Sequence, residues 1–382
     1  MRYFFGCYIP LGELMRIAVF NEAATYESRV ALTPDAIKKL GGQHSVIIEE
    51  GAGIRAGFSD DHFDKVGADI AKAKDCAGAD VVVHVAPLTA AQLKLLKSGT
   101  ITVGVQKPHY NQDAITMQAN QGLTSFAMEL IPRISRAQSM DMLSSQSNLA
   151  GYKAVIDAVA EFDRAIPMMM TAAGTIPPAK MLIIGAGVAG LQAIATAKRL
   201  GAVVTAYDVR PEVKEQVESL GGKFLEVDSE ESGEASGGYA KEMSAEYKKA
   251  QAAKLAEAVP TQDIVITTAQ IPGRSAPKLI TAEMLKQMQS GSVIIDMAVE
   301  TGGNCAYSQL GKTINQGGVK IIGPANLPAR LPRDASQVFA RNIISFMQNL
   351  HDEKGQVRWD DEIVSSSVLT HEGKVVHPQF KG

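Results

Sequence analysis

The segment RISRAQSMDMLSSQSN, residues 133–148, gathers many side chains that can form hydrogen bonds. It contains two arginines, one aspartate, two glutamines, five serines and one asparagine, but neither glycine nor proline. It is too polar for a core and lacks the residues that usually break a linker. Amides, hydroxyls and a pairable Arg and Asp suit the orientation of a polar ligand, whereas a solvated helix is the alternative.

A glycine-rich turn follows the apolar run at 180–186. Gly185-Ala-Gly187-Val-Ala-Gly190 fits the pattern GxGxxG, comes after an apolar strand and opens a stretch of small residues. In that context the pattern predicts a dinucleotide-binding turn of the Rossmann type, with incidental glycines in a structural unit as the alternative. Gly185 would permit the tight turn, Gly187 the approach of the pyrophosphate and Gly190 close packing of helix and strand. The helix start would offer N–H groups and a positive dipole end to the phosphates.

The next apolar run of this unit ends at Asp208. A carboxylate at that position accepts hydrogen bonds from the adenosine ribose of NAD and repels the 2′-phosphate of NADP. Arg210 lies close in sequence, and an arginine can accommodate that phosphate instead. Because Asp208 occupies the strand end, the sequence predicts NAD(H) as the preferred cofactor.

The nicotinamide end is expected beyond the carboxyl ends of the later strands. Candidate segments there are TTAQIPG (267–273), MAVETGGN (297–304) and residues 133–148. The cofactor-binding residues predicted on these grounds are Gly185, Gly187, Val188, Ala189, Gly190, Asp208, Val209, Arg210, Ala269 and Gln270.

A helix over residues 138–148 would place Gln138, Asp141 and Ser145 on one face, and also Asp141 with Ser144. Such a face could hold the carboxamide and ribose of the nicotinamide half. Arg133 could pair with Asp141 or with a phosphate.

The composition excludes several classes of protein. The chain has 382 residues, of which 46% are hydrophobic and 21% charged, and a net charge of −3. This balance does not favour nucleic acid or an anionic membrane as a partner. The three cysteines lack metal-ligand spacing, which argues against a zinc site or a disulfide framework, so no metal is predicted. No apolar run is long enough to span a bilayer, and a cytoplasmic setting is expected.

Strand-like and helix-like segments alternate along most of the chain. Apolar runs at 16–20, 45–50, 79–85 and 99–105 predict strands, as do runs at 180–186, 202–208, 263–269, 292–298 and 319–326. Helices are predicted at 33–40, with Thr33 as N-cap, at 149–165 and at 335–350. Met168–Met170 are interpreted as packing against a sheet. The tail VVHPQF, 375–380, is interpreted as a short strand or arm.

This pattern predicts an α/β fold of two Rossmann-like doubly wound parallel-sheet domains with a cleft between them. The expected first domain comprises 15–145 plus 336–382, and the second comprises 146–335. Residues 1–14 are interpreted as an extension. Residues 228–251, rich in Ser, Gly and Glu at their start, are either a solvated insertion or a mobile lid over a nucleotide. Gly238 and Tyr239 are the lid residues predicted to bind the cofactor.

Several segments resemble a known family. PRISRAQSMDMLSSQSNLAGYKAV, MMMTAAGTIPPAKMLIIGAGVAGLQAIATAKRLGA and EQVESLGGKF are similar to the NAD(H)-binding subunit of the proton-translocating nicotinamide nucleotide transhydrogenases. The likeness extends from MRIAVFNEAATYESRVALTPDAI to HEGKVVHPQF, which is nearly everything after Met15. The same fold family includes alanine dehydrogenase, which carries an ESRVALTP-like segment and is the rival interpretation.

The sequence departs from the alanine dehydrogenase pattern. Those enzymes resemble one another in a Lys-x-Glu-Pro segment, a His after the next strand and an Asp before Gly-Gly. This chain has His84 without a lysine, Gln106 in place of the histidine and Glu300 in place of the aspartate, so that only Arg29 of the set remains. An amino-acid dehydrogenase needs a general acid/base and cations for the substrate carboxylate, so these departures favour a transhydrogenase, which needs orientation and exclusion of water.

The resemblance implies roles for individual residues. Arg133, Asp141 and Ser144 would position the dihydronicotinamide, and Gln138 would reach toward NADP(H) on a partner subunit. Asp208 would bind the adenosine ribose, and Tyr239 would close over the NAD.

The resemblance also implies an assembly. The activity would be that of a Re/Si-specific, proton-translocating NAD(P)+ transhydrogenase, of which this chain is subunit alpha. It would form a homodimer and associate with membrane subunits, namely a small alpha membrane subunit and a beta subunit bearing the NADP-binding domain. Proton movement would reside in those partners, and the chain would lie on the cytoplasmic face of the inner membrane without inserting into it.

Overall fold

The computed structural model describes residues 15–22, 24, 26–40, 44–227, 243–271, 273–352 and 355–381. The chain divides into two compact units, Met1–Gln146 with Ala329–Gly382 (unit 1) and Ser147–Pro328 (unit 2). The first boundary falls within helix α5, Met142–Glu161. The second falls at 328, whereas the sequence places it at 335. The expected extension at 1–14 lies outside the described residues.

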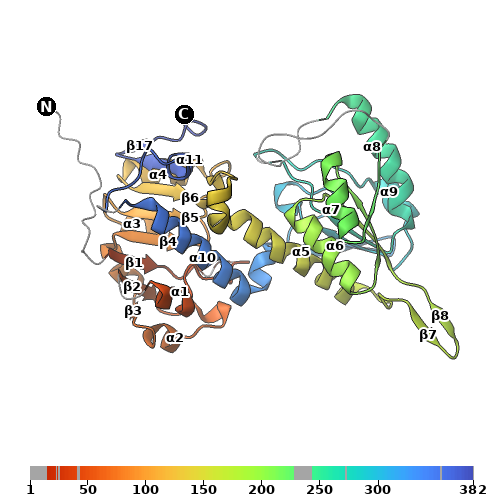
Figure 1. The fold of residues 1–382 in the computed structure, drawn as a ribbon, viewed down its shortest axis with the longest axis horizontal. Coiled ribbons are helices and arrows are strands. Elements are labelled where there is room, and N and C mark those ends of the chain that lie inside the picture. The colour runs from red at the N-terminus through yellow and green to blue at the C-terminus, as the bar shows by residue number, and fades with distance from the viewer. Residues whose placement is uncertain are drawn as a thin grey trace. The chain divides into compact units, whose positions relative to one another are not determined.

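Unit 1 contains an eight-stranded sheet of order β17-β16-β6-β5-β4-β1-β2-β3 (Figure 1). The six strands from β3 to β6 are parallel, and β16 and β17 extend the sheet by antiparallel pairing. The parallel order 3-2-1-4-5-6 is that of a doubly wound dinucleotide-binding fold. The strands are β1 Met15–Val19, β2 His44–Glu49, β3 Asp69–Ala71, β4 Val81–His84, β5 Ile101–Gly104, β6 Thr124–Ala127, β16 Val368–His371 and β17 Lys374–Val375.

Unit 2 repeats this arrangement in a seven-stranded sheet of order β11-β10-β9-β12-β13-β15-β14. The strands are parallel except for the edge strand β14, which pairs antiparallel with β15. The six parallel strands again follow the order 3-2-1-4-5-6, so the predicted α/β class with two Rossmann-like sheets is confirmed. The strands are β9 Lys180–Ile184, β10 Val203–Tyr207, β11 Lys223–Phe224, β12 Ile264–Thr267, β13 Val293–Asp296, β14 Lys312–Gln316 and β15 Val319–Gly323.

The helices begin and end close to the predicted signals. In α1, Thr33 caps the first turn by accepting a hydrogen bond from the Ala36 backbone N–H at 3.4 Å, as the sequence predicts. The helices of unit 1 are α1 Pro34–Lys39, α2 Asp60–Asp64, α3 Ala90–Leu95, α4 Gln112–Asn120, α10 Pro332–Leu350 and α11 Glu362–Ser367; those of unit 2 are α6 Val188–Arg199, α7 Lys214–Ser219, α8 Ala245–Ala258 and α9 Ala282–Gln287.

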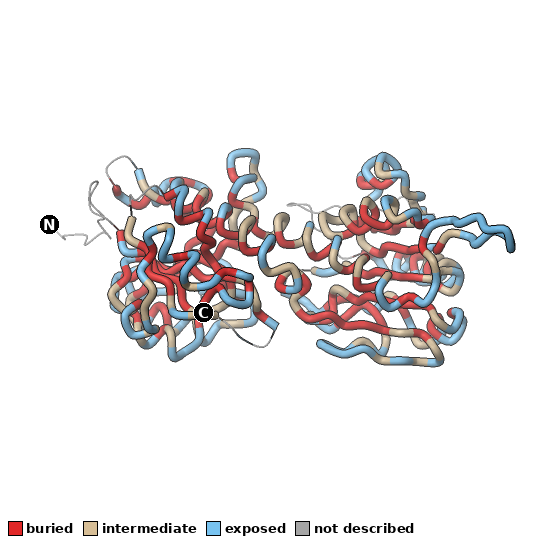
Figure 2. The backbone as a smooth tube through the Cα atoms, turned by 90° about the horizontal axis from the view of Figure 1, so that it is seen from below, coloured by how far each residue is buried: buried red, intermediate tan, exposed pale blue. Residues whose placement is uncertain are grey.

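Each sheet buries both of its faces, as the nearly continuous apolar strands predict. In β1, Ile17 and Val19 join one hydrophobic cluster while Ala18 joins another. In β9, Ile183 and Leu182 likewise belong to separate clusters. Figure 2 shows the resulting buried strands through each unit, flanked by more exposed helices.

A two-stranded hairpin, β7 Met169–Thr171 with β8 Gly174–Ile176, extends from the body of unit 2 (Figures 1 and 2). Met168, Met169 and Met170 on it are 60%, 46% and 81% exposed. The interpretation that these methionines pack against a sheet is therefore wrong. Pro167 ends the preceding segment, and the chain leaves the body of the unit before the next methionine can be covered.

Candidate functional site

The glycine turn of unit 2 has the backbone that its sequence predicts. Gly185 follows β9 with φ +102°, a left-handed conformation that favours glycine. A Cβ atom on Gly190 would lie 1.8 Å from the carbonyl oxygen of Gly185, so helix α6 can approach the turn only without a side chain there. A Cβ atom on Gly187 would meet only the Arg210 guanidinium, at 3.9 Å, which leaves that part of the backbone accessible.

Helix α6 begins at this turn without a side-chain cap. Its N-cap residue is Gly187, which has no side chain that could accept a hydrogen bond from the first turn. The first N–H groups of any helix lack intrahelical acceptors, and here they belong to Val188 and Ala189. Together with the dipole of a 12-residue helix they form a site for an anionic group such as a pyrophosphate.

Asp208 lies beside this turn at the end of β10. Its Oδ2 accepts a hydrogen bond from the Ala186 backbone N–H at 2.7 Å. Its carboxylate also pairs with Arg210, whose Nη2 lies 2.8 Å from Oδ2 and whose Nε lies 2.9 Å from Oδ1. The structure thus brings together Asp208, Arg210 and the glycine turn, with Val209 partly buried between the pair.

The loop after β12 is fixed by residues that the sequence does not single out. Buried Asn304 accepts a hydrogen bond from the Ala269 N–H at 3.1 Å and donates to the Ala269 carbonyl at 2.9 Å. Gln270 donates to the carbonyl of Met297. Asp296, also buried, accepts from the N–H groups of Ala298 and Cys305.

The remaining candidates of unit 2 have mixed outcomes. Gly238 and Tyr239 lie outside the described residues, so their predicted role stays a prediction. Within the predicted lid at 228–251, residues from Ala245 onward form helix α8, capped by Ser244. Glu300 accepts a hydrogen bond from the Asn326 N–H, at 3.0 Å.

In unit 1, the polar segment at 133–148 is two structures rather than one helix. Residues Ser135–Met140 form a 3-10 helix, η4, and Asp141 separates it from α5. The Asp141 carboxylate accepts from the Ser144 N–H at 2.9 Å and from its hydroxyl at 2.5 Å. Asp141 therefore caps α5, which explains why this helix begins seven residues before the predicted start at 149.

The same segment is anchored to distant parts of unit 1. Arg136 forms an ion pair of 2.6 Å with Asp361, the N-cap residue of α11. Ser145 donates a hydrogen bond to the Asn342 side chain of α10, whose amide in turn donates to the carbonyl of Ser139. These contacts fix the backbone around Gln138 and Arg133, whose side chains are exposed.

Arg29 is buried and held by its own chain. Its guanidinium pairs with Glu27 at 2.7 Å and donates to Gln146 at 2.8 Å. Gln146 donates in turn to the carbonyl of Ala335. This arginine therefore serves as a link between the first loop of unit 1 and the polar segment.

His84 and Gln106 belong to a buried polar network below the sheet edge. The Nδ1 of His84 lies 2.9 Å from the carbonyl of Ala86, and since a carbonyl only accepts, Nδ1 carries the proton. Nε2 then accepts from the Gln106 amide at 3.3 Å, and Gln106 also contacts Thr102 and Gln118. Burial lowers the pKa of His84 to about 4, so it is neutral near pH 7.

Both halves of the chain match known protein families. Residues 18–150 match the family described as alanine dehydrogenase/PNT, N-terminal domain, and residues 154–378 match alanine dehydrogenase/PNT, C-terminal domain. The chain belongs to the alanine dehydrogenase/PNT family.

Transhydrogenases and alanine dehydrogenases both occur among the relatives. The first segment of NAD(P) transhydrogenase subunit alpha from Rhodospirillum rubrum, which is a separate chain there, is 51% identical over 381 residues, which cover 96% of this chain and 99% of the relative. A crystal structure of transhydrogenase from Sinorhizobium meliloti has a TM-score of 0.84 at 46% identity and covers 95% of this chain and 99% of that chain. Alanine dehydrogenase of Halomonas elongata is 30% identical over 376 residues, 95% of each chain.

Other features common in members of enzyme families add little here. Within the described part of the chain, no three His, Cys, Asp or Glu side chains form a metal site, and no helix is long and apolar enough to span a membrane. Cys76 and Cys305 are buried free thiols, while Cys7 lies outside the described residues.

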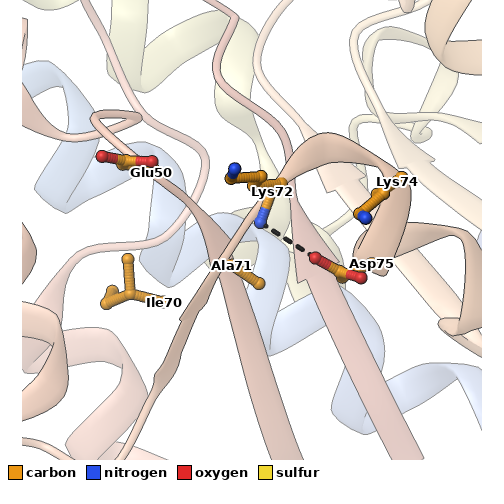
Figure 3. A pocket seen from close by; sticks show the side chains of 6 residues that line it. All are labelled: Glu50, Ile70, Ala71, Lys72, Lys74 and Asp75. Carbon is orange, nitrogen blue, oxygen red and sulfur yellow. Dashed lines mark hydrogen bonds between the residues drawn. The ribbon is translucent and has the colours of Figure 1, made fainter.

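An open pocket of about 440 Å³ lies at the edge strand β3 (Figure 3). Its lining mixes two lysines with two acidic residues and none of the predicted site residues; it comprises Glu50, Ile70, Ala71, Lys72, Lys74 and Asp75.

Proposed function

We propose that this chain is the NAD(H)-binding subunit of a proton-translocating transhydrogenase. The observation that carries this proposal is a contrast within unit 1. The residues through which an amino-acid dehydrogenase would act are held by the chain itself, since Arg29 pairs with Glu27 and His84 lies in a closed network. Arg133 and Gln138, which would serve an approaching nicotinamide, are exposed on an anchored backbone.

Unit 2 supports the choice of NAD(H). The uncapped start of α6 suits a pyrophosphate, and Asp208 lies beside it where an adenosine ribose would be bound. Ala269 and Gln270 lie on the fixed loop after β12, at the carboxyl edge of the same sheet. Gly238 and Tyr239 are proposed to close over the bound nucleotide.

The reaction needs little acid–base chemistry from this chain. When bound, the reduced nicotinamide supplies a hydride, with both bonding electrons, to an oxidised nicotinamide carried by the partner. Arg133, Asp141 and Ser144 are proposed to fix the ring, and the Asp141–Ser144 contact already restrains two of these side chains. Gln138 is proposed to reach toward the NADP(H). Orientation and exclusion of water then account for catalysis without a general base.

The proposed assembly contains partners that complete the activity. A beta subunit would bind NADP(H), a small alpha membrane subunit would join it, and proton movement would occur in those membrane subunits. This chain would lie on the cytoplasmic face of the inner membrane. We also propose a homodimer, supported by the hairpin β7–β8, because an isolated two-stranded hairpin with exposed apolar side chains is marginal in water unless another surface covers it.

The test substitutes Gln138→Asn in the full chain and measures hydride transfer with the NADP(H)-binding partner subunit. We expect turnover to fall by roughly 100-fold because the donor and acceptor rings lose their alignment, while NADH affinity changes little. Gln112→Asn, at an exposed glutamine of α4, is the matched control and should leave both unchanged. Unchanged turnover in Gln138→Asn would remove the bridging role. Rapid oxidation of NADH by pyruvate and ammonia without a partner would instead establish an alanine dehydrogenase.

A further inference from the structure

The carboxylate of Asp208 has its acceptor positions filled by its own chain. Oδ1 accepts from the backbone N–H of Arg210 at 3.0 Å and from its Nε at 2.9 Å. Oδ2 accepts from Nη2 of Arg210 at 2.8 Å and from the Ala186 N–H at 2.7 Å. An ionised carboxylate offers about four lone-pair positions, so these four hydrogen bonds saturate it.

The Arg210 side chain lies against the glycine turn as well. Its Nη2 is 3.9 Å from the position that a Cβ atom on Gly187 would take. The side chains of Arg210 and Asp208 are only 12% and 5% exposed, so the ion pair is largely removed from water. One guanidinium thus contacts the ribose-binding carboxylate and also borders the backbone that a pyrophosphate would approach.

We infer that Arg210 is an internal competitor of the adenosine ribose for Asp208. This inference rests on the proposed binding of NAD(H) at the glycine turn. A ribose hydroxyl can donate to Asp208 only if it replaces Nε or Nη2 of Arg210, whereas the two backbone N–H donors are part of the turn and stay. Part of the binding free energy of the adenosine half is therefore spent on breaking the ion pair, which favours release of the nucleotide.

The same pair determines how strongly the site rejects a 2′-phosphate. A carboxylate that is already neutralised by a bidentate arginine repels a second anion less than a bare one does. Arg210 can also remain near the 2′-phosphate and pair with it. Removal of Arg210 should therefore tighten the binding of a ribose without phosphates and weaken the binding of a 2′-phosphorylated ribose.

The test measures equilibrium binding to the full chain by calorimetry, with adenosine and 2′-AMP as probes. In Arg210→Ala we expect adenosine to bind about 5- to 10-fold more tightly than in the unaltered chain, which corresponds to about 1 kcal/mol, and 2′-AMP to bind more weakly. Arg210→Gln, which keeps one possible donor without the charge and is better tolerated beside a buried carboxylate, should fall between the two. Arg199→Ala, at an exposed arginine of α6, is the control and should change neither affinity.

Three results would separate the two ideas. Unchanged or weaker adenosine binding in Arg210→Ala and Arg210→Gln, while Asp208→Asn still weakens NADH binding, overturns the competition and leaves the proposed function intact. Opposite shifts of adenosine and 2′-AMP affinity support the competition. Failure of the unaltered chain to bind NADH or adenosine overturns both.

Discussion

At the carboxyl edge of the unit 1 sheet, side chains satisfy the backbone donors that an anion would use, whereas the matching edge of unit 2 leaves the start of a long helix uncapped. In unit 1 the helix after the first strand, α1, is capped by Thr33. In unit 2 the corresponding helix, α6, begins at Gly187 without a side-chain cap. Both sheets share the strand order 3-2-1-4-5-6, so the architecture alone does not distinguish them.

Two acidic side chains reinforce this difference in unit 1. Glu22, after β1, accepts hydrogen bonds from the N–H groups of Val85 and Ala86, the latter at 2.6 Å. Glu129, after β6, accepts from the N–H groups of Gln106 and Lys107. Each carboxylate occupies donors at the end of a neighbouring strand. The difference teaches that a Rossmann-like edge binds a nucleotide only where its own side chains leave the helix start available.

The largest expected effect comes from a pair of glycine substitutions that should break the comparison if it is wrong. In Gly190→Ala the new Cβ would lie 1.8 Å from the Gly185 carbonyl and would push α6 away from the turn. Overpacking of this kind costs about 1–3 kcal/mol, so NADH affinity should fall by roughly 10- to 100-fold. Calorimetric titration with NADH measures the loss.

Gly104→Ala is the matched substitution in unit 1. Its Cβ would lie 2.0 Å from the carbonyl oxygen of His84 and should cost a similar free energy of unfolding. NADH affinity should nevertheless remain that of the unaltered chain, because the clash lies in the closed edge. An equal loss of NADH affinity in folded Gly104→Ala would show that both edges contribute to the nucleotide site.

The closed network of unit 1 should also make its stability depend on acid. Burial lowers the folded pKa of His84 from 6.5 to about 4, so between these pH values the unfolded chain binds a proton that the folded chain excludes. The contribution of His84 to the free energy of unfolding is therefore fully present above pH 6.5 and falls by up to about 3 kcal/mol as the pH drops to about 4. Urea unfolding at several pH values measures this slope.

His84→Asn isolates this contribution, because an asparagine can still donate to Ala86 but cannot take up a proton. Its stability should fall less steeply below pH 6.5 than that of the unaltered chain, while other histidines with lowered pKa values, such as His44 and His351, act equally in both proteins. Identical slopes would mean that His84 is not shielded from water.

The smallest effect is expected at Glu129. Glu129→Ala removes the acceptor of two backbone N–H groups and should lower the free energy of unfolding by about 1–3 kcal/mol. Glu129→Gln keeps a carbonyl acceptor and removes a carboxyl group whose pKa is raised by burial, so it should cost less. Thermal unfolding compares the two, and NADH affinity should not change in either variant. A larger loss in the glutamine variant would show that the charge, rather than the acceptor, fixes the loop.

Much of the fold can be predicted from the sequence because the signals are local. Apolar runs indicate strands such as β9 and β12, and Thr33 with Pro34 indicates the start of α1. The predicted first helical residue of α5 is wrong, because the cap is Asp141 in a segment whose polar side chains are read equally well as one helix. The exposed β7–β8 hairpin is missed, because methionines carry no signal that tells a core from a surface.

The sequence by itself determines the glycine turn, because tight φ angles, a close helix approach and an accessible backbone all follow from a few adjacent residues. Tertiary structure alone decides what each polar group contacts. Arg29 with Gln146, Ser145 with Asn342 and Arg136 with Asp361 are separated by more than a hundred residues, and their pairing depends on how the whole of unit 1 packs. Hydrogen bonds need donor and acceptor within a few tenths of an ångström, and only the folded chain fixes distances on that scale.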